Sequence, residues 1–410
     1  MDMINSRGKN EMKNVKMEKF KMKKILSLLL AVGLLLALSA CTFGSGETVS
    51  SAEPEPVEST AAASSTGLDG YRNPLTGEET ETDISRNCPV GVMLNNVKEA
   101  LPQSGNSKAD MFYEVPEEGG ITRILALFQD VTGVGQIGTV RSTRPYFVRL
   151  AVGQDALLTH CGGSNQAYVI IKKYMEKADF NDIDCLNHGT NCAYSYFKRS
   201  EARLNAGFAL ENTMYIHSDN IQAFLEKNKD TIRTTHKPDY APAQQFVEDG
   251  TPAQGSSAKS IDVVMSQYKH TLFDYDESTG SYGVTEFGSP YIDEVTGEQI
   301  HVENVVVLLT DISVNEQSKL GHLSVVLTGT GTGYYACGGK FIPITWEKKS
   351  VEDQQRFYDQ DGNQIKFGIG KTYICVVDKA RNITMDEVVQ PKPADANEAD
   401  TQVDSMAQVN

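Results

Sequence analysis

The sequence predicts an α+β protein, with a mixed α/β segment over residues 69–233 and a β-rich segment, a sandwich or an open barrel, over residues 260–385. In the first segment, short apolar runs bounded by turn residues alternate with runs whose apolar residues recur every three to four positions. In the second segment, strand patterns follow one another closely, separated by turns. The 410 residues, 40% of them hydrophobic, can form a core for each segment.

The first 41 residues have the pattern of an export signal. Eight basic residues precede an apolar run over residues 25–40, which is shorter than the roughly 20 residues that a spanning helix needs. The run ends in LSAC, which resembles a bacterial lipobox, where a signal peptidase cuts before the cysteine and the thiol carries diacylglycerol. We therefore expect residues 1–41 to be a lipoprotein signal peptide and Cys41 to be the lipidation site. The expected location is the outer face of the bacterial cytoplasmic membrane, and an uncut membrane anchor is the alternative.

The mature chain is strongly acidic. Removal of residues 1–41 leaves 30 basic and 51 acidic residues, a formal charge of −21. This charge disfavours nucleic acid as a partner, because its binding draws on clustered Lys and Arg. Attachment to the membrane is therefore expected through the diacylglycerol on Cys41. Residues 42–68, rich in Ser, Thr, Glu, Pro and Ala, are expected to be a flexible tether, and residues 386–410 an acidic disordered tail.

The first segment begins with strands and continues with helices between them. Strands are expected over residues 89–96, 110–115, 121–128 and 156–162. Helices are expected over residues 143–154 and 165–177, the second capped by Ser164, and a further strand and helix follow from Met214, with Ser218 and Asp219 as cap candidates. Residues 234–259 contain three prolines and little periodicity, which predicts an interdomain linker.

The second segment is predicted to be almost entirely β-structure. Apolar runs such as ENVVVLLTDI, YYACGGKFIPITWEK and KTYICVVD are typical of strands. The GTGTG run over residues 329–333 lacks the lysine of a P-loop and the helix of a dinucleotide fingerprint, so we expect a bulge or hairpin loop. Trp346, the only tryptophan, is expected to be a core residue.

Several long motifs resemble one known family. NPLTGEE, PVGVMLNNVKEALPQSGNSKADMFYEVPEEGGITRILALFQD, IGTVRSTRPYFVRLA, LLTHCGGSNQA, SPYIDEVTGEQIHVENVVV and GTGTGYYACGGKFIPITWEK are similar to the DUF3048 family of YerB-type lipoproteins, over about residues 73–380. The resemblance implies an envelope lipoprotein with an α/β N-terminal domain, a β-rich C-terminal domain and no established biochemical activity. Two departures are that Cys88 stands where the family pattern has arginine, and that residues 211–215 lack a histidine.

Polar residues gather around the predicted strand ends of the first segment. Two arginines three positions apart at the start of a predicted helix could clamp a carboxylate or a phosphate, with a glutamate balancing their charge. The candidate ligand-binding residues are Asn95, Asp110, Glu114, Glu118, Arg123, Arg141, Arg144 and His160, with Asn96, Ser142 and Asp155 beside them. The alternative is that Glu114 or Glu118 forms structural ion pairs with Arg123, Arg141 or Arg144.

The sequence contains no convincing catalytic set. Glu114 and Glu118 are the candidates for the acid and base of a hydrolase, which would require a carboxyl separation of about 5–5.5 Å or about 6.5–9.5 Å. His160 and Cys161 are adjacent on a strand and would point to opposite faces, and a G-x-S-x-G motif is lacking. No His pair at i, i+4 and no Cys-x-x-Cys occurs, so neither a metal nor a cofactor is predicted.

Six cysteines remain in addition to Cys41, and we expect mostly free thiols, with Cys185–Cys192 as the local pair that could close. The predicted function is that of a lipid-anchored envelope protein that binds or scaffolds another envelope protein or a cell-wall component such as peptidoglycan. The alternative is a cell-wall hydrolase that uses Glu114 and Glu118.

Overall fold

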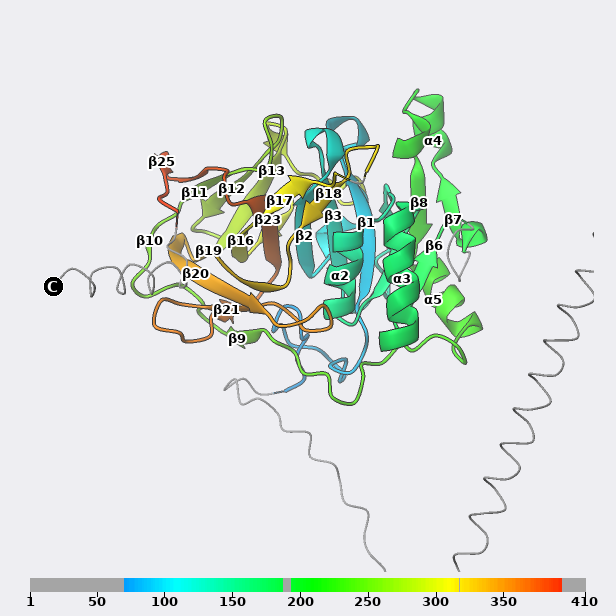
Figure 1. The fold of residues 1–410 in the computed structure, drawn as a ribbon, viewed down its shortest axis with the longest axis horizontal. Helices are drawn as coiled ribbons and strands as arrows, with labels where there is room; N and C mark the ends of the chain where they lie inside the picture. Colours follow the sequence, from blue (N-terminus) through cyan, green and yellow to red (C-terminus); the bar gives the residue numbers. More distant parts are fainter. Residues whose placement is uncertain (1–69, 187–192, 317, 393–410) are drawn as a thin grey trace, which may run out of the picture. The chain divides into compact units, whose positions relative to one another are not determined.

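The computed structural model describes residues 70–186, 193–316 and 318–392, and one sheet of eleven strands runs through them (Figure 1). The strand order is β10-β20-β19-β16-β23-β2-β3-β1-β5-β6, with β21 paired to β20. The predicted signal peptide, Cys41, the tether and Cys192 lie outside the described residues. No helix within the described ranges is long and apolar enough to cross a membrane.

The two sequence segments share this sheet. Strand β2 of the first segment pairs in parallel with β23 of the second, with Met111 opposite Thr372 and Glu114 opposite Cys375. The first segment contributes β1 (Val90–Asn96), β2 (Met111–Pro116), β3 (Thr122–Phe128), β5 (Leu157–His160) and β6 (Asp182–Asp184). The second contributes β16 (Asn304–Thr310), β19 (Gly329–Cys337), β20 (Lys340–Lys348), β21 (Arg356–Tyr358) and β23 (Thr372–Asp378). The segments are therefore parts of one β-rich fold.

The predicted linker is built into the fold. Residues 234–259 include β9 (Gln245–Val247), which pairs with β22 (Lys366–Gly368), and β10 (Ser256–Ser257), which pairs with β20 at the edge of the large sheet. The predicted tail likewise starts with β25 (Val388–Val389), which pairs with β24 (Ile383–Met385). These short strands have weak patterns of their own, and their hydrogen-bond partners lie far away in the sequence.

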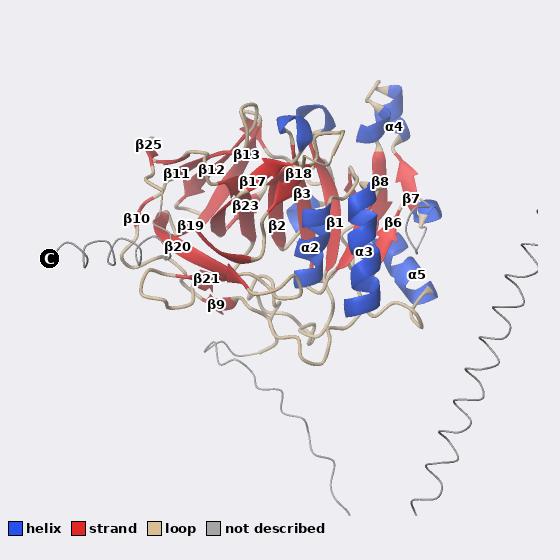
Figure 2. Cartoon of the chain, viewed as in Figure 1, coloured by secondary structure: helices blue, strands red, loops and turns tan. Residues whose placement is uncertain are grey.

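Helices cover one face of the large sheet. Helix α2 (Pro145–Gly153) and helix α3 (Asn165–Ala178) lie side by side, and their apolar residues pack with Met93, Tyr113 and Leu125 of the strands (Figures 1 and 2). The Ser164 side chain accepts a hydrogen bond from the Ala167 N–H, as an N-cap does. The expected helices over residues 143–154 and 165–177 and the expected cap are thus confirmed.

The other face is covered by two smaller sheets. In one, β4 (Gln136–Gly138), β8 (Met214–His217) and β7 (Phe197–Arg199) carry α5 (Ser218–Lys227). The other contains seven strands: β11 (Ser260–Val264), β12 (His270–Asp276), β13 (Ser281–Glu286), β14 (Ser289–Pro290), β15 (His301–Val302), β24 and β25. The short pair β17 (Ile312–Val314) and β18 (Leu323–Val325) and helix α4 (Glu201–Asn205) complete these elements. Phe112, Phe273 and Tyr373 stack where the large sheet meets the seven-stranded sheet.

Two local predictions were wrong. The N-cap of α5 is His217, whose Nδ1 accepts from the Asp219 N–H, because the helix starts one residue earlier than expected. The GTGTG run forms the start of β19 and is no loop. Glycine is required there because a Cβ at Gly331 would lie 2.6 Å from the ring of Trp346, which is buried and donates to the Leu309 carbonyl at 3.0 Å.

Candidate functional site

The site lies at the carboxyl ends of the parallel strands β1, β5 and β6. Strands β1 and β5 pair only from Val90 to Val92, and beyond that point the segment around Arg141 enters between them. The Arg141 N–H donates to the Met93 carbonyl at 2.8 Å, and the Arg141 carbonyl accepts from the Cys161 N–H at 3.0 Å. The arginines of the VRSTR run are therefore held at the edge of the sheet where α/β proteins commonly bind ligands.

Two helices start at the same edge. Arg144 is the N-cap of α2, with Pro145 at its first position, and Ser164 is the N-cap of α3. The Thr143 N–H donates to the Gly162 carbonyl at 2.9 Å, which ties the two helix starts together. Because the N-terminus of a helix carries partial positive charge, both helices add to the preference of this edge for an anion.

Two of the three arginines are occupied by glutamates. Arg144 donates to both oxygens of Glu118, with Nε 3.3 Å from Oε2, so the predicted Glu118–Arg144 ion pair is present. Arg123 donates through Nη1 to Glu117 Oε1 and to the Ser142 carbonyl, both at 2.6 Å. The partner of Arg123 is thus Glu117 and neither of the predicted glutamates, because Arg123 lies opposite Val115 and residues two apart on a strand share a face.

Arg141 is the unoccupied arginine of this edge. Within the residues that the structure describes, its guanidinium has no hydrogen-bond or ion-pair partner, and its Nε is shielded from solvent without an acceptor. The side chain as a whole remains partly exposed. Burial lowers the pKa of Arg123 to about 10 and raises the pKa of Glu117 to about 7. Asp184 adds a further carboxylate at this edge, where its Oδ1 accepts from the Gly162 N–H at 2.9 Å.

Glu114 lies on the opposite face of β2, and its predicted place in the arginine site was wrong. It is fully buried, 3.1 Å from Lys269 Nζ, and accepts from Thr122 Oγ1 at 2.6 Å and from the Tyr373 hydroxyl at 3.0 Å. Lys269 also pairs with Glu286. Glu114 and Glu118 therefore belong to separate networks on opposite faces, and they do not face a common position where a hydrolase would hold its substrate.

The other predicted ligand-binding residues have structural partners. The Asn95 amide donates to Asn212 Oδ1 at 2.7 Å. Asp110 accepts from the Gln129 N–H at 2.6 Å, and burial raises its pKa to about 6. His160 is buried with Nε2 3.1 Å from Asp182 Oδ2, and although burial opposes its charge, this carboxylate raises its pKa. The structure therefore brings Glu118, Arg123, Arg141 and Arg144 together and places Asn95, Asp110 and His160 in separate contacts.

Two family models match the chain. The model described as "Protein of unknown function (DUF3048) N-terminal domain" covers residues 75–232, and the model of the DUF3048 C-terminal domain covers residues 261–374. The chain belongs to the DUF3048 family. The matched ranges correspond to the two sequence segments, and they meet in one sheet where β2 pairs with β23.

One curated and one solved relative were found. The chain is 28% identical over 316 residues to a Bacillus subtilis (strain 168) protein named "Putative lipoprotein YerB", covering 74% of this chain and 85% of that protein. It is also similar to the crystal structure of the YerB protein from Bacillus subtilis, with a TM-score of 0.62 and 26% identity over 76% of this chain and 99% of that chain. The predicted family resemblance is thus confirmed across both segments.

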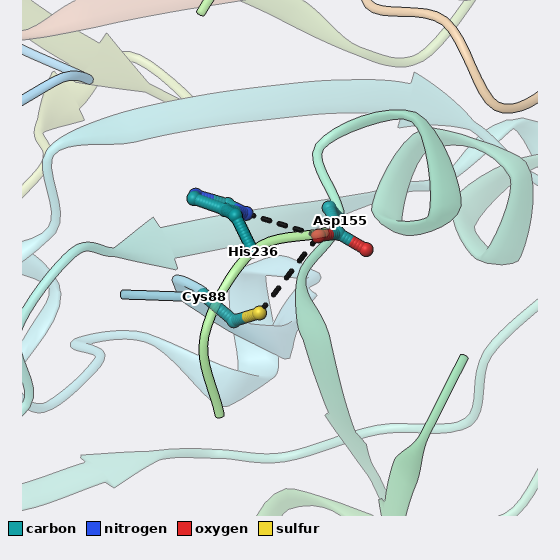
Figure 3. A group of neighbouring side chains, drawn as sticks. All are labelled: Cys88, Asp155 and His236. Atoms are coloured by element: carbon teal, nitrogen blue, oxygen red, sulfur yellow. Dashed lines mark hydrogen bonds and ion pairs between the residues drawn. The ribbon is translucent and has the colours of Figure 1, made fainter. Parts of the chain in front are cut away.

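A second cluster of this DUF3048 protein lies where β1 and β5 begin, and Figure 3 draws its three side chains, Cys88, Asp155 and His236. Asp155 Oδ2 is 3.0 Å from His236 Nδ1 and 3.9 Å from Cys88 Sγ, and the three potential ligand atoms lie within 4.8 Å of one another. No spacing in the sequence indicates this group, since His236 follows Cys88 by almost 150 residues and no metal-site pattern links them. Asp155 stands between the thiol and the imidazole, so His236 does not contact Cys88 as a catalytic base would.

Arg233 makes this cluster a poor fit for a metal ion. Its guanidinium donates to both oxygens of Asp155, at 2.6 and 2.9 Å, and to Cys88 Sγ at 3.2 Å. Lys237 Nζ is a further cation, 3.8 Å from Asp155. Burial raises the pKa of Cys88 to about 12, so the thiol keeps its proton. The donors that a divalent ion would need are therefore already paired with positive charge, and we interpret the group as a structural network around Asp155.

A pocket that the sequence did not indicate lies between the predicted linker, residues 234–259, and the β-rich segment of the DUF3048 fold. Its volume is about 650 Å³, within the range typical of small-ligand sites. Its lining comes from four stretches of the chain and includes Asp249, Tyr335, Ile342, Pro343, Asp359 and Asp361. Asp249 and Asp359 accept hydrogen bonds from neighbouring N–H groups, at Thr251 and Asn363. The pocket combines an aromatic ring and apolar walls with negative charge, which suits a ligand that carries amino or hydroxyl groups.

Proposed function

We propose that this protein is a lipid-anchored extracytoplasmic binding module, and that the edge around Arg141 binds an anionic group of a cell-envelope component. The observation that carries the proposal is the guanidinium of Arg141, which has no partner among the described residues while Arg123 and Arg144 beside it are paired. The lipobox-like LSAC motif and the lipoprotein named among its relatives support the envelope location.

The chemistry of the edge favours a carboxylate or a phosphate. A guanidinium binds either group through two parallel N–H donors, and the starts of α2 and α3 add positive potential. Glu118 is only half-buried, so an incoming anion could also displace it from Arg144. Peptidoglycan stem peptides carry carboxylates and anionic wall polymers carry phosphates, so both are suitable partners. The buried position of Glu114 argues against the hydrolase alternative.

Binding of defined muropeptides to the mature chain by isothermal titration calorimetry tests the proposal. A hydrogen-bonded charge contributes about 1.5–3 kcal/mol, so Arg141→Ala is expected to weaken binding by roughly 10- to 150-fold. Arg141→Lys should retain part of the affinity, because it keeps the charge but loses the planar donor pair. Lys172→Ala, which removes an exposed charge from α3, is the matched control and should bind like the unchanged protein.

A second candidate is recognition of an amine-bearing ligand in the pocket of the β-rich segment, which its volume and its carboxylates favour. Asp361→Asn separates the two, because it removes an exposed carboxylate of the pocket and leaves the arginine edge unchanged. If muropeptide binding survives Arg141→Ala and is lost in Asp361→Asn, the arginine edge is not the binding site and the pocket is.

A further inference from the structure

Two cysteines occupy neighbouring positions at the ends of β5 and β6. These strands run parallel in the register Leu158↔Asp182, Thr159↔Ile183 and His160↔Asp184, so the next position brings Cys161 opposite Cys185. The Cys185 N–H donates to the His160 carbonyl at 2.9 Å, which extends the strand pairing to this point. Adjacent strands are about 4.8 Å apart, within the Cα separation of about 4.4–6.8 Å that a disulfide spans.

The two side chains also point in the same direction. Cys185 belongs to the core between the large sheet and the two smaller sheets, and Cys161 packs against that same core. The thiols are close enough for each to shift the pKa of the other, with Cys185 lowering the pKa of Cys161. Cys185 is buried, whereas Cys161 is partly exposed and can be reached by an oxidant. The other described cysteines have different surroundings: Cys88 contacts Asp155 and Arg233, Cys337 contacts Tyr335, and Cys375 is buried on β23 beside Glu114.

We propose that Cys161 and Cys185 form a disulfide in the exported protein, which links the edge strand β6 to β5. Strand β6 has three residues and, among the strands that the structure describes, pairs with β5 alone, so a covalent link would tie an edge strand to the sheet. The bond also fixes the backbone beside Arg141, because the Cys161 N–H donates to its carbonyl. The proposal goes beyond ligand binding and holds whether or not Arg141 binds an anion.

The reaction is a thiol–disulfide exchange with an extracytoplasmic oxidoreductase that carries a reactive disulfide. The Cys161 thiolate attacks one donor sulfur, forms a mixed disulfide and releases the other donor sulfur as a thiolate. The Cys185 thiolate then attacks the Cys161 sulfur, which forms the Cys161–Cys185 bond and releases the second donor thiolate. The two protons lost by the cysteines end on the donor, which leaves as its dithiol. Cys161 is the first nucleophile because it is partly exposed whereas Cys185 is buried, and the neighbouring Cys185 thiol lowers its pKa.

Peptide mapping of the full mature chain, secreted through an oxidising compartment and alkylated without reduction, tests this pairing. Trypsin cuts after Arg149, Lys172, Lys177 and Lys198, so Cys161 and Cys185 fall on different peptides whereas Cys185 and Cys192 share one. The expected result is a cross-linked pair, residues 150–172 with residues 178–198, that separates on reduction. Cys161→Ser and Cys185→Ser should each abolish the cross-link, and Cys88→Ser and Cys192→Ser should leave it intact; a cross-link that persists in Cys185→Ser would assign the bond to Cys192 and overturn the proposal.

Two outcomes would overturn the proposal. One is a single peptide over residues 178–198 that is lighter by two hydrogens, which would show a Cys185–Cys192 bond. The other is full alkylation of both Cys161 and Cys185 in the unreduced protein, which would show that they remain thiols after export. Because the mapping reads the bond itself, its result is independent of any ligand-binding measurement.

Discussion

The buried lysine between the two family segments offers the sharpest test of what holds the fold together. Lys269 is 1% exposed and contacts Glu114 and Glu286, which are both fully buried. The Lys269→Met change keeps the length of the side chain and removes its charge, so two buried carboxyls lose their cation. Removal of one partner from a buried ion pair typically costs about 3–5 kcal/mol of unfolding free energy.

The pH dependence of this loss follows from the carboxyls. Burial and the charge of Glu114 already raise the pKa of Glu286 to about 8, while Lys269, against the effect of burial, lowers the pKa of Glu114. For a carboxyl whose pKa is higher in the folded chain than in the unfolded chain, the contribution to folding stability is fully present below the pKa of the unfolded chain, near 4.5. That contribution is lost as the pH rises through the pKa of the folded chain. In Lys269→Met, Glu114 loses the cation that keeps it ionised and must be held protonated as well, which costs about 1.4 kcal/mol per pH unit above 4.5, hence below 1 kcal/mol at pH 5 and about 5 kcal/mol at pH 8.

Urea unfolding at pH 5 and pH 8, followed by the fluorescence of the single buried tryptophan, measures both values. The double variant Lys269→Met with Glu286→Gln should recover part of the loss at pH 8, because one of the unpaired carboxyls is gone. Lys259→Met is the matched control: it breaks an exposed pair with Glu277 that solvent screens, so the urea midpoint should hardly change at either pH. A loss below 1 kcal/mol for Lys269→Met that is equal at both pH values would refute the reasoning.

The remaining predictions concern stability at two other places. If the Cys161–Cys185 disulfide forms, it closes a loop of about 24 residues, and its reduction should lower the unfolding free energy by roughly 3–4 kcal/mol. In Cys161→Ser, the reductant should no longer change stability. Urea midpoints with and without reductant measure both effects. Gly331→Ala should cost about 1–3 kcal/mol and lower the melting temperature, because the new Cβ would lie 2.6 Å from the Trp346 ring; Thr330→Ala, exposed on the same strand, should change little.

Elements with a strong local pattern could be predicted from the sequence. The β2–β3 hairpin joins two apolar runs across a Gly-Gly turn, and α3 has an apolar stripe behind a serine cap. The pairing of β2 with β23 could not be predicted, because a parallel contact between strands about 260 residues apart leaves no local pattern. For the same reason the sequence predicts a linker at β9 and β10, which become strands only against β22 and β20.

The candidate site was predicted where its contacts are local and missed where they are not. Glu118 lies in the turn of the β2–β3 hairpin and Arg144 at the start of α2, and the sequence predicts their ion pair as one alternative. Alternation along the strand from Glu114 places Glu117 on the same face as Arg123. With three glutamates in five positions, the sequence alone does not indicate which of them pairs with this arginine. The true partner of Glu114 is Lys269, which no spacing rule connects to it.

The shared sheet and the buried charges together explain why the two family segments act as one unit. Without the second segment, β2 would lose its neighbour β23 and expose an edge of backbone donors and acceptors. Glu114 would at the same time lose Lys269 and Tyr373, which leaves a carboxylate without its charge partner. Both losses fall on β2, whose end leads directly into Glu117 and Glu118. The second segment therefore supports the strand that positions the arginine edge, although it contributes none of the three arginines.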